Sequence, residues 1–424
     1  MIEKEVLKEV LLRQRKLFEE RMKEKQVERE RLDKIEQLKK LPHAVVISGV
    51  RRAGKSYLLS QIAKKFYSSY YYINFEDERL AGFSLEDFEL LYQTSLELFG
   101  EAKTFLLDEI QNVNKWERWV RRMQDEGFKM YLTGSNARLL SKELGTLLTG
   151  RHIQVLLFPF SFTEFLRLKN FDLKKEDVYL TERKARIAKY FEEYLQKGGF
   201  PDYLKYENVE ILQGYFNDII QRDVLQRYPI KHPVQLKELA RYTITNSGKL
   251  ATYNKLREVV ELNSTNTVIK YMDYLKTAYL IITVPFFSYS LRQQIRNPFK
   301  IYSIDVGMKN AISFSFSADI GRAYENIAAV DLFRRGYEVY YWKNEKGREV
   351  DFVIKKGRHV EQLIQVSYDL KENKERETAA LIDASNKLRC NNLLILTSSY
   401  EGEEKVLNKK IHYTPLWKWL LRVD

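Results

Sequence analysis

The stretch "VVISGVRRAGKS", residues 45–56, decides the fold of the chain around it. A short apolar run ends at Gly49, a pair of arginines follows, and Gly54, Lys55 and Ser56 close the stretch. The spacing matches the pattern G-x-x-x-x-G-K-[S/T], between a predicted buried strand, "AVVIS", and a predicted helix, "SYLLSQIAKKF". In this context, backbone N–H groups of the loop and the positive end of the helix bind phosphate groups. The stretch therefore predicts a nucleotide-binding α/β domain.

Each side chain of the loop has an expected role. Lys55 is expected to neutralise the β- and γ-phosphates, and the hydroxyl of Ser56 is expected to bind Mg²⁺, so that ATP and Mg²⁺ are the expected cofactors. The structural alternative is a glycine-rich turn that binds nothing, and the strand, loop and helix context argues against it. The predicted nucleotide site comprises Gly49, Arg51, Arg52, Ala53, Gly54, Lys55, Ser56 and Tyr57.

The stretch "TFLLDEIQ" places two acidic residues at the end of an apolar strand. Asp108 is expected to hold Mg²⁺ through water, and Glu109 is expected to act as the general base toward the attacking water. An acidic pair at the end of a strand is also common as a helix cap. The phosphate loop upstream favours the catalytic interpretation.

The next predicted strand, "KMYLTGSN", ends in three polar residues, Thr133, Ser135 and Asn136. If neighbouring strands end at the same edge of the sheet, these side chains lie beside Glu109. We assign the sensing of the γ-phosphate to Asn136. The alternative is an ordinary polar turn, because these residue types are common in turns.

Composition and length limit the possible classes of protein. At 424 residues, 44% of them hydrophobic, the chain is long enough for about three domains with real cores. A formal net charge of +13 favours a polyanionic partner, with nucleic acid as the first candidate. The single cysteine, Cys390, excludes an internal disulfide, fits a reducing compartment and is expected to be a core residue.

Neither a signal peptide nor a membrane helix is predicted. The first forty residues alternate acids and bases around scattered apolar positions, unlike the short uncharged centre of a signal peptide. No stretch approaches the roughly 18 consecutive apolar residues that a membrane helix needs. We therefore expect a cytoplasmic protein.

Hydrophobic periodicity divides the chain into five predicted parts. Residues 1–40 are expected to form one amphipathic helix that packs on the next domain. Short apolar runs alternate with helical patterns over residues 41–166, which indicates a parallel sheet. The pattern is helical over 167–232, helices and a hairpin with a basic tip follow over 233–305, and a smaller α/β domain covers 306–424.

Residues 44–166 resemble the AAA+-type P-loop ATPase domain of a large group of archaeal and bacterial proteins. The resemblance rests on "GVRRAGKS", "FLLDEIQ", "YLTGSN" and "LLTGRHIQVLLFPFSFTEFL". In that group the ATPase is joined to a winged helix and to a DUF4143-like C-terminal domain similar to PD-(D/E)XK nucleases. The stretches "GGFPDYL", "YFNDIIQRDVLQR", "KIYSIDVGM" and "EVDFVIKK" extend the resemblance over nearly the whole chain after residue 40.

The fold class that this resemblance implies is α/β. It combines a P-loop NTPase parallel sheet, a helical lid, a winged helix and a restriction-endonuclease-like α/β domain. In AAA+-type assemblies an arginine near this part of the sheet commonly reaches the γ-phosphate held by a neighbouring subunit. Arg151 is the matching residue, and it implies a homo-oligomer in which it acts in trans. The alternative for Arg151 is a surface or salt-bridged arginine.

Residues 235–300 are interpreted as a winged helix-turn-helix. Its third predicted helix begins with short polar side chains and a cation, which suit base edges or phosphates, and basic residues follow on the hairpin. The alternative is a domain that contacts only proteins, and specific base readout is not expected because few residues have bidentate geometry. The predicted DNA-binding residues are Thr265, Asn266, Thr267, Lys270, Arg292, Arg296 and Lys300.

The C-terminal part matches the nuclease signature incompletely. By the resemblance, Glu325 corresponds to the helix acid and Asp351 to the strand aspartate, while Gln365 and Ser367 stand where an acid and a lysine are required. Ser367 cannot replace an ammonium that stabilises developing negative charge. We expect this domain to bind nucleic acid or support assembly without cutting. Residual Mg²⁺-dependent cleavage and a buried, hydrogen-bonded pair of acids are the alternatives.

Together these features predict a Mg²⁺-dependent ATPase that couples its ATP state to the binding or remodelling of structured or branched DNA. One alternative is a STAND-like signalling ATPase that binds proteins. The other is an ATP-gated DNA endonuclease. DNA-stimulated hydrolysis separates the DNA-coupled ATPase from the signalling ATPase. DNA cleavage that depends on Asp351 identifies the endonuclease.

Overall fold

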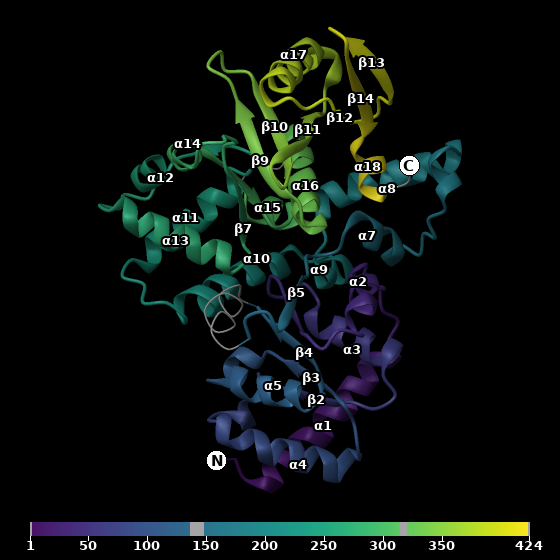
Figure 1. Ribbon diagram of the computed structural model, residues 1–424, viewed down its shortest axis with the longest axis vertical. Helices are drawn as coiled ribbons and strands as arrows, with labels where there is room; N and C mark the ends of the chain where they lie inside the picture. The colour runs from purple at the N-terminus through teal and green to yellow at the C-terminus, as the bar shows by residue number, and fades with distance from the viewer. Residues whose placement is uncertain (1, 136–147, 314–319, 423–424) are drawn as a thin grey trace. The chain divides into compact units, whose positions relative to one another are not determined.

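The computed structural model describes residues 2–135, 148–313 and 320–422 (Figure 1). The chain forms two compact units, Met1–Phe158 and Pro159–Asp424. The first unit thus ends before residue 166, where the sequence placed the end of the ATPase domain. The reason is that α7 (Phe162–Leu168) contacts α8 (Thr181–Lys197) and α18 (Leu416–Leu421), which all belong to the second unit.

A five-stranded parallel sheet forms the centre of the first unit. Its strand order is β2-β3-β4-β1-β5, and every neighbouring pair is parallel, as predicted. All residues of β1 and β3 are buried, because helices and loops cover both faces of the sheet. The strands are β1 (Ala44–Ser48), β2 (Tyr71–Asn74), β3 (Thr104–Asp108), β4 (Lys129–Gly134) and β5 (His152–Leu156).

Helices cover this sheet and form an apolar core on each of its faces. Figure 1 shows α1 and α4 side by side at one side of the unit, where they are in contact. Phe88 stacks on Trp119 with ring centroids 4.5 Å apart, and so joins two of the helices. The described helices are α1 (Lys4–Lys23), α2 (Arg31–Leu38), α3 (Lys55–Phe66), α4 (Phe88–Phe99) and α5 (Trp116–Asp125), with 3-10 turns η1 (Glu78–Leu80), η2 (Leu85–Asp87) and η3 (Ile110–Asn112).

The N-terminal segment is two helices, α1 and α2, and the prediction of one helix over residues 1–40 was wrong. The chain leaves the helix at Glu24 and follows α3 instead. The side chain of Gln26 donates to Ser60 Oγ over 3.1 Å, and the backbone N–H of Arg29 donates to Gln61 Oε1 over 3.1 Å. These tertiary hydrogen bonds outweigh the helix propensity of a segment rich in Glu and Lys.

The second unit begins with a set of helices, as the sequence predicted. The glycine pair among them allows a close approach: a Cβ on Gly199 would lie 2.3 Å from Phe160 O, and Gly198 has φ +68°. Asp305 accepts from the backbone N–H of Gly199 over 2.7 Å and from that of Met308 over 3.0 Å. Besides α7 and α8, these elements are η5 (Lys175–Val178), α9 (Pro201–Tyr206), α10 (Val209–Asp218), the π-helix η6 (Ile219–Leu225) and α15 (Val306–Ile312).

Four helices and a small antiparallel sheet follow. The sheet order is β6-β8-β7, and β7 pairs with β8 as the predicted hairpin requires. Its tip contains a helical turn, α14, because the N–H groups of Gln293 and Gln294 both donate to Ser290 O. The elements are α11 (Pro233–Thr245), β6 (Leu250–Ala251), α12 (Tyr253–Val259), α13 (Thr265–Thr277), β7 (Ile281–Val284), α14 (Leu291–Arg296) and β8 (Phe299–Ser303).

A mixed six-stranded sheet completes the second unit, with order β13-β14-β12-β11-β10-β9. β10 pairs antiparallel with β9 and β11, whereas β11, β12 and β14 are parallel. Cys390 is a free, buried core residue, as expected. The elements are α16 (Ile320–Arg335), β9 (Glu338–Lys343), β10 (Glu349–Lys356), β11 (His359–Ser367), α17 (Leu370–Leu388), β12 (Leu393–Thr397), β13 (Gly402–Val406), β14 (Lys409–Pro415) and α18.

Candidate functional site

The glycine-rich loop between β1 and α3 follows a path that only glycine allows at its start. Gly49 has φ +149°, and a Cβ there would lie 2.0 Å from Leu157 O. Gly54 has φ +94° at the start of α3. The backbone N–H of Leu157 donates to Ser48 O over 2.7 Å, so the chain after β5 lies directly against the loop. The loop therefore has a defined shape at the carboxyl end of β1, where open α/β sheets bind ligands.

Arg29 braces this loop from behind, a role that sequence reasoning missed. Its side chain is buried, with 4% of the residue exposed, and its two terminal nitrogens donate to Ala53 O and to Phe158 O, each over 2.6 Å. A Cβ on Gly54 would lie 3.2 Å from the guanidinium. The sequence around Arg29 alternates acids and bases and offers no signal that this arginine points inward.

Lys55 lies inside the loop. Only 5% of the residue is exposed, and Nζ donates to Gly49 O over 3.2 Å and to Val50 O over 3.3 Å. The same nitrogen is 3.9 Å from Glu109 Oε1. The ammonium is thus held by two backbone carbonyls and a distant carboxylate, an arrangement that phosphate oxygens can replace.

Asp108 and Glu109 lie at the carboxyl end of β3, and Glu109 reaches the loop through Lys55. Asp108 is fully buried and accepts from Tyr72 OH over 3.2 Å and from the hydroxyl of Thr133. Glu109 has φ +52°, its N–H donates to Thr133 Oγ1 over 2.9 Å, and its carboxylate accepts from Gln111. Burial raises the pKa of Glu109 above its usual value, although Lys55 opposes the rise. A carboxylate with a raised pKa is a better proton acceptor.

Other predicted loop residues flank this centre. Ser56 is half-buried in the first turn of α3, and Arg51 pairs with Glu76 over 3.3 Å. Arg52 is exposed and has φ +68°. Tyr57 is 42% exposed and donates to Glu24, away from the loop carbonyls. Lys55, Ser56, Asp108 and Glu109 together are the donor set that a triphosphate and Mg²⁺ require, so the residues fit these ligands.

Of the three polar residues at and after the end of β4, Thr133 contacts both members of the acidic pair. Ser135 is fully buried. Asn136, which the sequence favoured as the sensor, lies outside the described residues. Thr133 was considered with it, and the adjacency of β3 and β4 explains why its hydroxyl meets both Asp108 and Glu109.

Arg151 lies at the amino ends of the strands, whereas the loop lies at their carboxyl ends. It precedes β5, and its carbonyl accepts from the N–H of Ala44, the first residue of β1, over 3.0 Å. Its half-exposed side chain pairs with Asp125. Because β1 runs from Ala44 toward the loop, Arg151 is remote from the phosphate site of its own chain.

The predicted DNA-binding residues divide into surface residues and one buried residue. Asn266 and Lys270 are exposed at the start of α13, and Arg292 and Arg296 are exposed on α14. Thr265 and Thr267 are half-buried. The prediction that Lys300 lies on a DNA-facing wing was wrong, since the residue is only 2% exposed.

The side chain of Lys300 instead lies among the carboxylates of the nuclease-like signature. Nζ is 2.8 Å from Glu325 Oε1, 2.8 Å from Asp351 Oδ1 and 2.7 Å from Glu349 Oε1. Tyr302 OH donates to the same oxygen of Glu325 over 2.6 Å. Burial opposes the charged form of Lys300, but Asp351 and Glu325 outweigh it and hold the pKa of Lys300 well above its usual value.

Gln365 and Ser367 have internal partners. Gln365 Oε1 accepts from the N–H of Asp351 over 3.1 Å, and its amide donates to Glu377 Oε2 over 2.5 Å. Ser367 Oγ donates to Asp369 O over 3.3 Å. Among residues 2–135, 148–313 and 320–422, no group of three or more His, Cys, Asp or Glu side chains is arranged to hold a metal ion.

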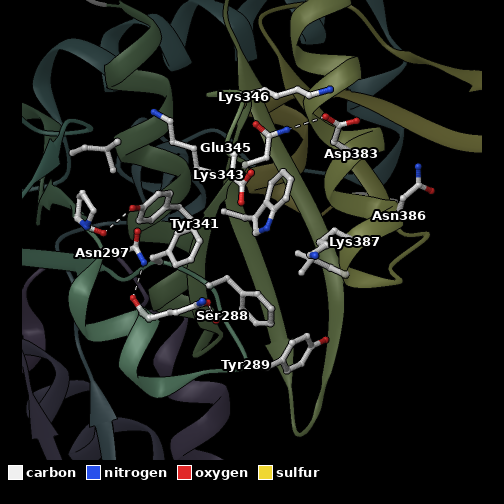
Figure 2. Close-up of a pocket in the computed structure, with 18 residues that line it drawn as sticks. Ser288, Tyr289, Asn297, Tyr341, Lys343, Glu345, Lys346, Asp383, Asn386 and Lys387 are labelled. Atoms are coloured by element: carbon white, nitrogen blue, oxygen red, sulfur yellow. Dashed lines mark hydrogen bonds between the residues drawn. The ribbon is translucent and has the colours of Figure 1, made fainter.

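A cavity of about 1040 Å³ opens in the second unit between the segment around α14, the β9–β10 turn and the end of α17. Figure 2 shows Ser288, Tyr289 and Asn297 at this cavity together with side chains from the other two segments. Tyr289 is 70% exposed. The lining includes the three lysines Lys343, Lys346 and Lys387.

In the part of the chain that the structure describes, no helix is long and apolar enough to span a membrane.

Comparison with protein families divides the chain into three matched segments. Residues 41–166 match an AAA domain. Residues 188–319 match a domain of unknown function, DUF8612, and residues 320–419 match another, DUF4143. The AAA match covers β1, the loop, β3 and β4, which are the elements that form the candidate site.

Among solved structures, the chain is similar at 16% identity to the replication initiator DnaA bound to AMPPCP and single-stranded DNA. That similarity covers 58% of this chain and 85% of DnaA, with a TM-score of 0.26. The RuvB Holliday junction branch migration motor of Thermotoga maritima is also similar, at 16% identity, covering 57% of this chain and 81% of RuvB, with a TM-score of 0.24. TM-scores this low support no conclusion.

Curated relatives cover nearly the whole chain. An uncharacterized protein of Haemophilus influenzae is 29% identical over 401 residues, which are 91% of this chain and 96% of the relative. The uncharacterized protein MJ1544 of Methanocaldococcus jannaschii is 40% identical over 405 residues, which are 91% of this chain and 90% of the relative. This chain therefore belongs to the same family as MJ1544, and the AAA domain at residues 41–166 supports an ATPase of the AAA+ type.

Proposed function

We propose that the protein is a Mg²⁺-dependent ATPase that couples its nucleotide state to the binding or remodelling of DNA. The observation that carries the ATPase part is the meeting of Lys55, Asp108 and Glu109 at one edge of a parallel sheet, with the Lys55 ammonium 3.9 Å from Glu109. The DNA part rests on the polar and basic surface of the second unit and on the net charge of +13.

In the proposed reaction, Lys55 exchanges its two backbone carbonyl partners for phosphate oxygens. Ser56 and Asp108 would hold Mg²⁺, which, when bound, neutralises charge on the phosphates. Glu109 accepts the proton of the attacking water. Thr133 fixes the acidic pair, because its oxygen contacts both the Asp108 carboxylate and the Glu109 N–H.

The position of Arg151 supports action on a neighbouring subunit. The phosphate loop of the same chain lies at the opposite ends of the strands. An arginine finger at Arg151 therefore requires a second copy of the chain. Mixing Arg151→Ala subunits with Lys55→Ala subunits tests this idea. Partial recovery of hydrolysis in the mixture supports action in trans, and failure of Arg151→Ala to change the rate contradicts it.

The second unit supports DNA binding through its winged-helix-like element order. α11, β6, α12, α13, β7 and β8 follow one another, and β8 lies between β6 and β7 in the sheet. α13 presents the exposed Asn266 and Lys270, and α14 presents Arg292 and Arg296. The cavity beside α14, with its lysines and the exposed Tyr289, adds cations and an aromatic ring suited to a nucleic-acid strand (Figure 2).

The decisive experiment measures ATP hydrolysis with single-stranded, duplex and branched DNA. We expect stimulation that falls with salt, and we expect Lys270→Ala combined with Arg292→Ala and Arg296→Ala to remove it. The matched control is Lys40→Ala, an exposed lysine of the first unit. A hydrolysis rate that no form of DNA changes contradicts the coupling and favours a signalling ATPase. The variant Glu109→Gln tests whether the protein hydrolyses ATP at this site.

A further inference from the structure

The carboxylate cluster of the second unit has an internal cation. Three elements that are separate in the sequence meet there: β8 contributes Lys300, α16 contributes Glu325, and β10 contributes Glu349 and Asp351. The similarity of this domain to metal-dependent nucleases would imply a divalent cation between Glu325, Asp351 and residue 365. Whether these residues can hold one depends on which of their oxygen atoms are available.

Four of the oxygen atoms that such a cation could use already have partners. Asp351 Oδ1 contacts the Lys300 ammonium, and Asp351 Oδ2 accepts from the N–H of Val366 over 2.9 Å. Gln365 Oε1 accepts from the Asp351 N–H. Glu325 Oε1 accepts from both Lys300 and Tyr302. The donor set therefore does not fit a divalent cation as it stands, because every one of these contacts would compete with metal ligation.

Electrostatics explains why an ammonium is needed. The side chains of Glu325 and Asp351 are 13% and 10% exposed, and two carboxylates at this distance from one cation repel each other if it is removed. Burial raises the pKa of Glu325 to about 7, with Lys300 opposing and Asp351 adding to the rise. Glu349, in contrast, has a lowered pKa because Lys300 and Lys343 outweigh its burial.

A further observation is that β11 lacks the lysine of the nuclease signature. Ser367 stands where the nuclease signature has a lysine, and its hydroxyl donates to a backbone carbonyl of its own loop rather than toward the carboxylates. The ammonium that contacts Asp351 comes from β8, which follows α14. The cation has thus been supplied by a different strand, in a position central to the acids.

We propose that the ammonium of Lys300 replaces the divalent cation of the nuclease-like domain, so that this domain works without a bound metal ion and is fastened by Lys300 to the sheet β6-β8-β7. Lys300 is then a positioning residue, which holds Glu325, Glu349 and Asp351 in place and joins β8 to β10 and α16. This inference is independent of the ATPase and of DNA binding by α13.

The test titrates nucleotide-free protein with Mn²⁺ and follows binding by electron paramagnetic resonance. The wild type and Asp351→Asn should bind Mn²⁺ equally, and EDTA should leave the melting temperature of the wild type unchanged. Lys300→Ala should gain a Mn²⁺ site, and adding Asp351→Asn to it should remove that site. The matched control, Lys405→Ala, changes an exposed lysine of the same domain and should bind Mn²⁺ as the wild type does.

Two outcomes would overturn the proposal without any use of Lys300 variants, which covers the case in which they do not fold. The first is Mn²⁺ binding to the wild type that Asp351→Asn abolishes. The second is Mg²⁺-dependent DNA cleavage by the wild type that Asp351→Asn abolishes. If Lys300→Ala folds and gains no Mn²⁺ site, the idea that the ammonium stands in for a metal ion also fails.

Discussion

Two buried lysines, one in each unit, have opposite surroundings. Lys55 donates to two backbone carbonyls and has its nearest carboxylate at 3.9 Å, whereas Lys300 has three carboxylates at 2.7–2.8 Å. The first ammonium keeps an incomplete set of anionic partners beside a loop shaped for phosphate. The second has a complete set. An incompletely neutralised lysine indicates a ligand site, and a fully neutralised one indicates a structural contact.

The same contrast separates the acids of the two regions. Glu109 has a raised pKa and accepts from Gln111 through Oε2, while its Oε1 is 3.9 Å from Lys55, so Oε1 is available to take a proton. Glu325 also has a raised pKa, but its Oε1 accepts hydrogen bonds from Lys300 and Tyr302. A raised pKa alone therefore does not identify a catalytic acid, because the hydrogen-bond partners decide whether the group can react.

The largest effect is expected from Glu109→Gln. The amide keeps the size of the side chain but cannot accept a proton, so hydrolysis should fall about 10²–10⁴-fold while ATP still binds. Steady-state rates and binding of a fluorescent ATP analogue measure the two effects. Loss of binding together with hydrolysis would show that Glu109 acts on the ground state instead.

The pH profile sharpens this prediction. Since burial raises the pKa of Glu109, the wild-type rate should still increase with pH where an ordinary glutamate is already ionised. Glu109→Gln should lose this limb of the profile. A wild-type rate that is flat across the acid range would contradict the role of Glu109 as the base.

Lys300→Ala is expected to cost about 3–5 kcal/mol in the unfolding free energy of the second unit, because it leaves buried carboxylates without their cation. Urea denaturation measures the cost, with Lys346→Ala as the exposed control, expected within about 0.5 kcal/mol of the wild type. Lys55→Ala should cost the first unit much less. Equal costs at both lysines would break the comparison.

Arg29→Ala is expected to lower the unfolding free energy of the first unit by about 1.5–3 kcal/mol, because two short hydrogen bonds to backbone carbonyls are lost. ATP affinity should fall with it, since the loop loses its brace. Denaturation and nucleotide binding measure both effects. Arg13→Ala, an exposed arginine on α1, is the control, and unchanged binding in Arg29→Ala would contradict the bracing role.

The smallest effect is expected from Thr133→Val, which keeps the shape of the side chain and removes its hydroxyl. The loss of hydrogen bonds to Asp108 and Glu109 should lower the hydrolysis rate about tenfold, which corresponds to about 1.4 kcal/mol. Thr94→Val, whose hydroxyl bonds only within α4, should leave the rate nearly unchanged. If both variants behave alike, Thr133 does not position the acidic pair.

The candidate ATP site could be predicted from short stretches of sequence. Gly49, Lys55 and the strand that ends in Asp108 each belong to a local pattern, and parallel strands bring their carboxyl ends to one edge. The N-terminal segment could not be predicted in the same way. Its helical periodicity continues through residues 24–30, and tertiary hydrogen bonds from Gln26 and Arg29 accompany the break in the helix there.

The sequence by itself determined the parallel nucleotide-binding sheet, its phosphate loop and its acidic strand end, because periodicity and motif spacing act over a few neighbouring residues. The tertiary structure alone decided that Arg29 braces the loop and that Lys300 lies among Glu325, Glu349 and Asp351. Arg29 stands among alternating acids and bases and Lys300 is a lone cation in a short strand, so nothing in the sequence distinguishes either from a surface residue. Their partners lie far away along the chain. Only the packing of the folded chain buries each charge beside them, and a buried charge is costly unless it is paired.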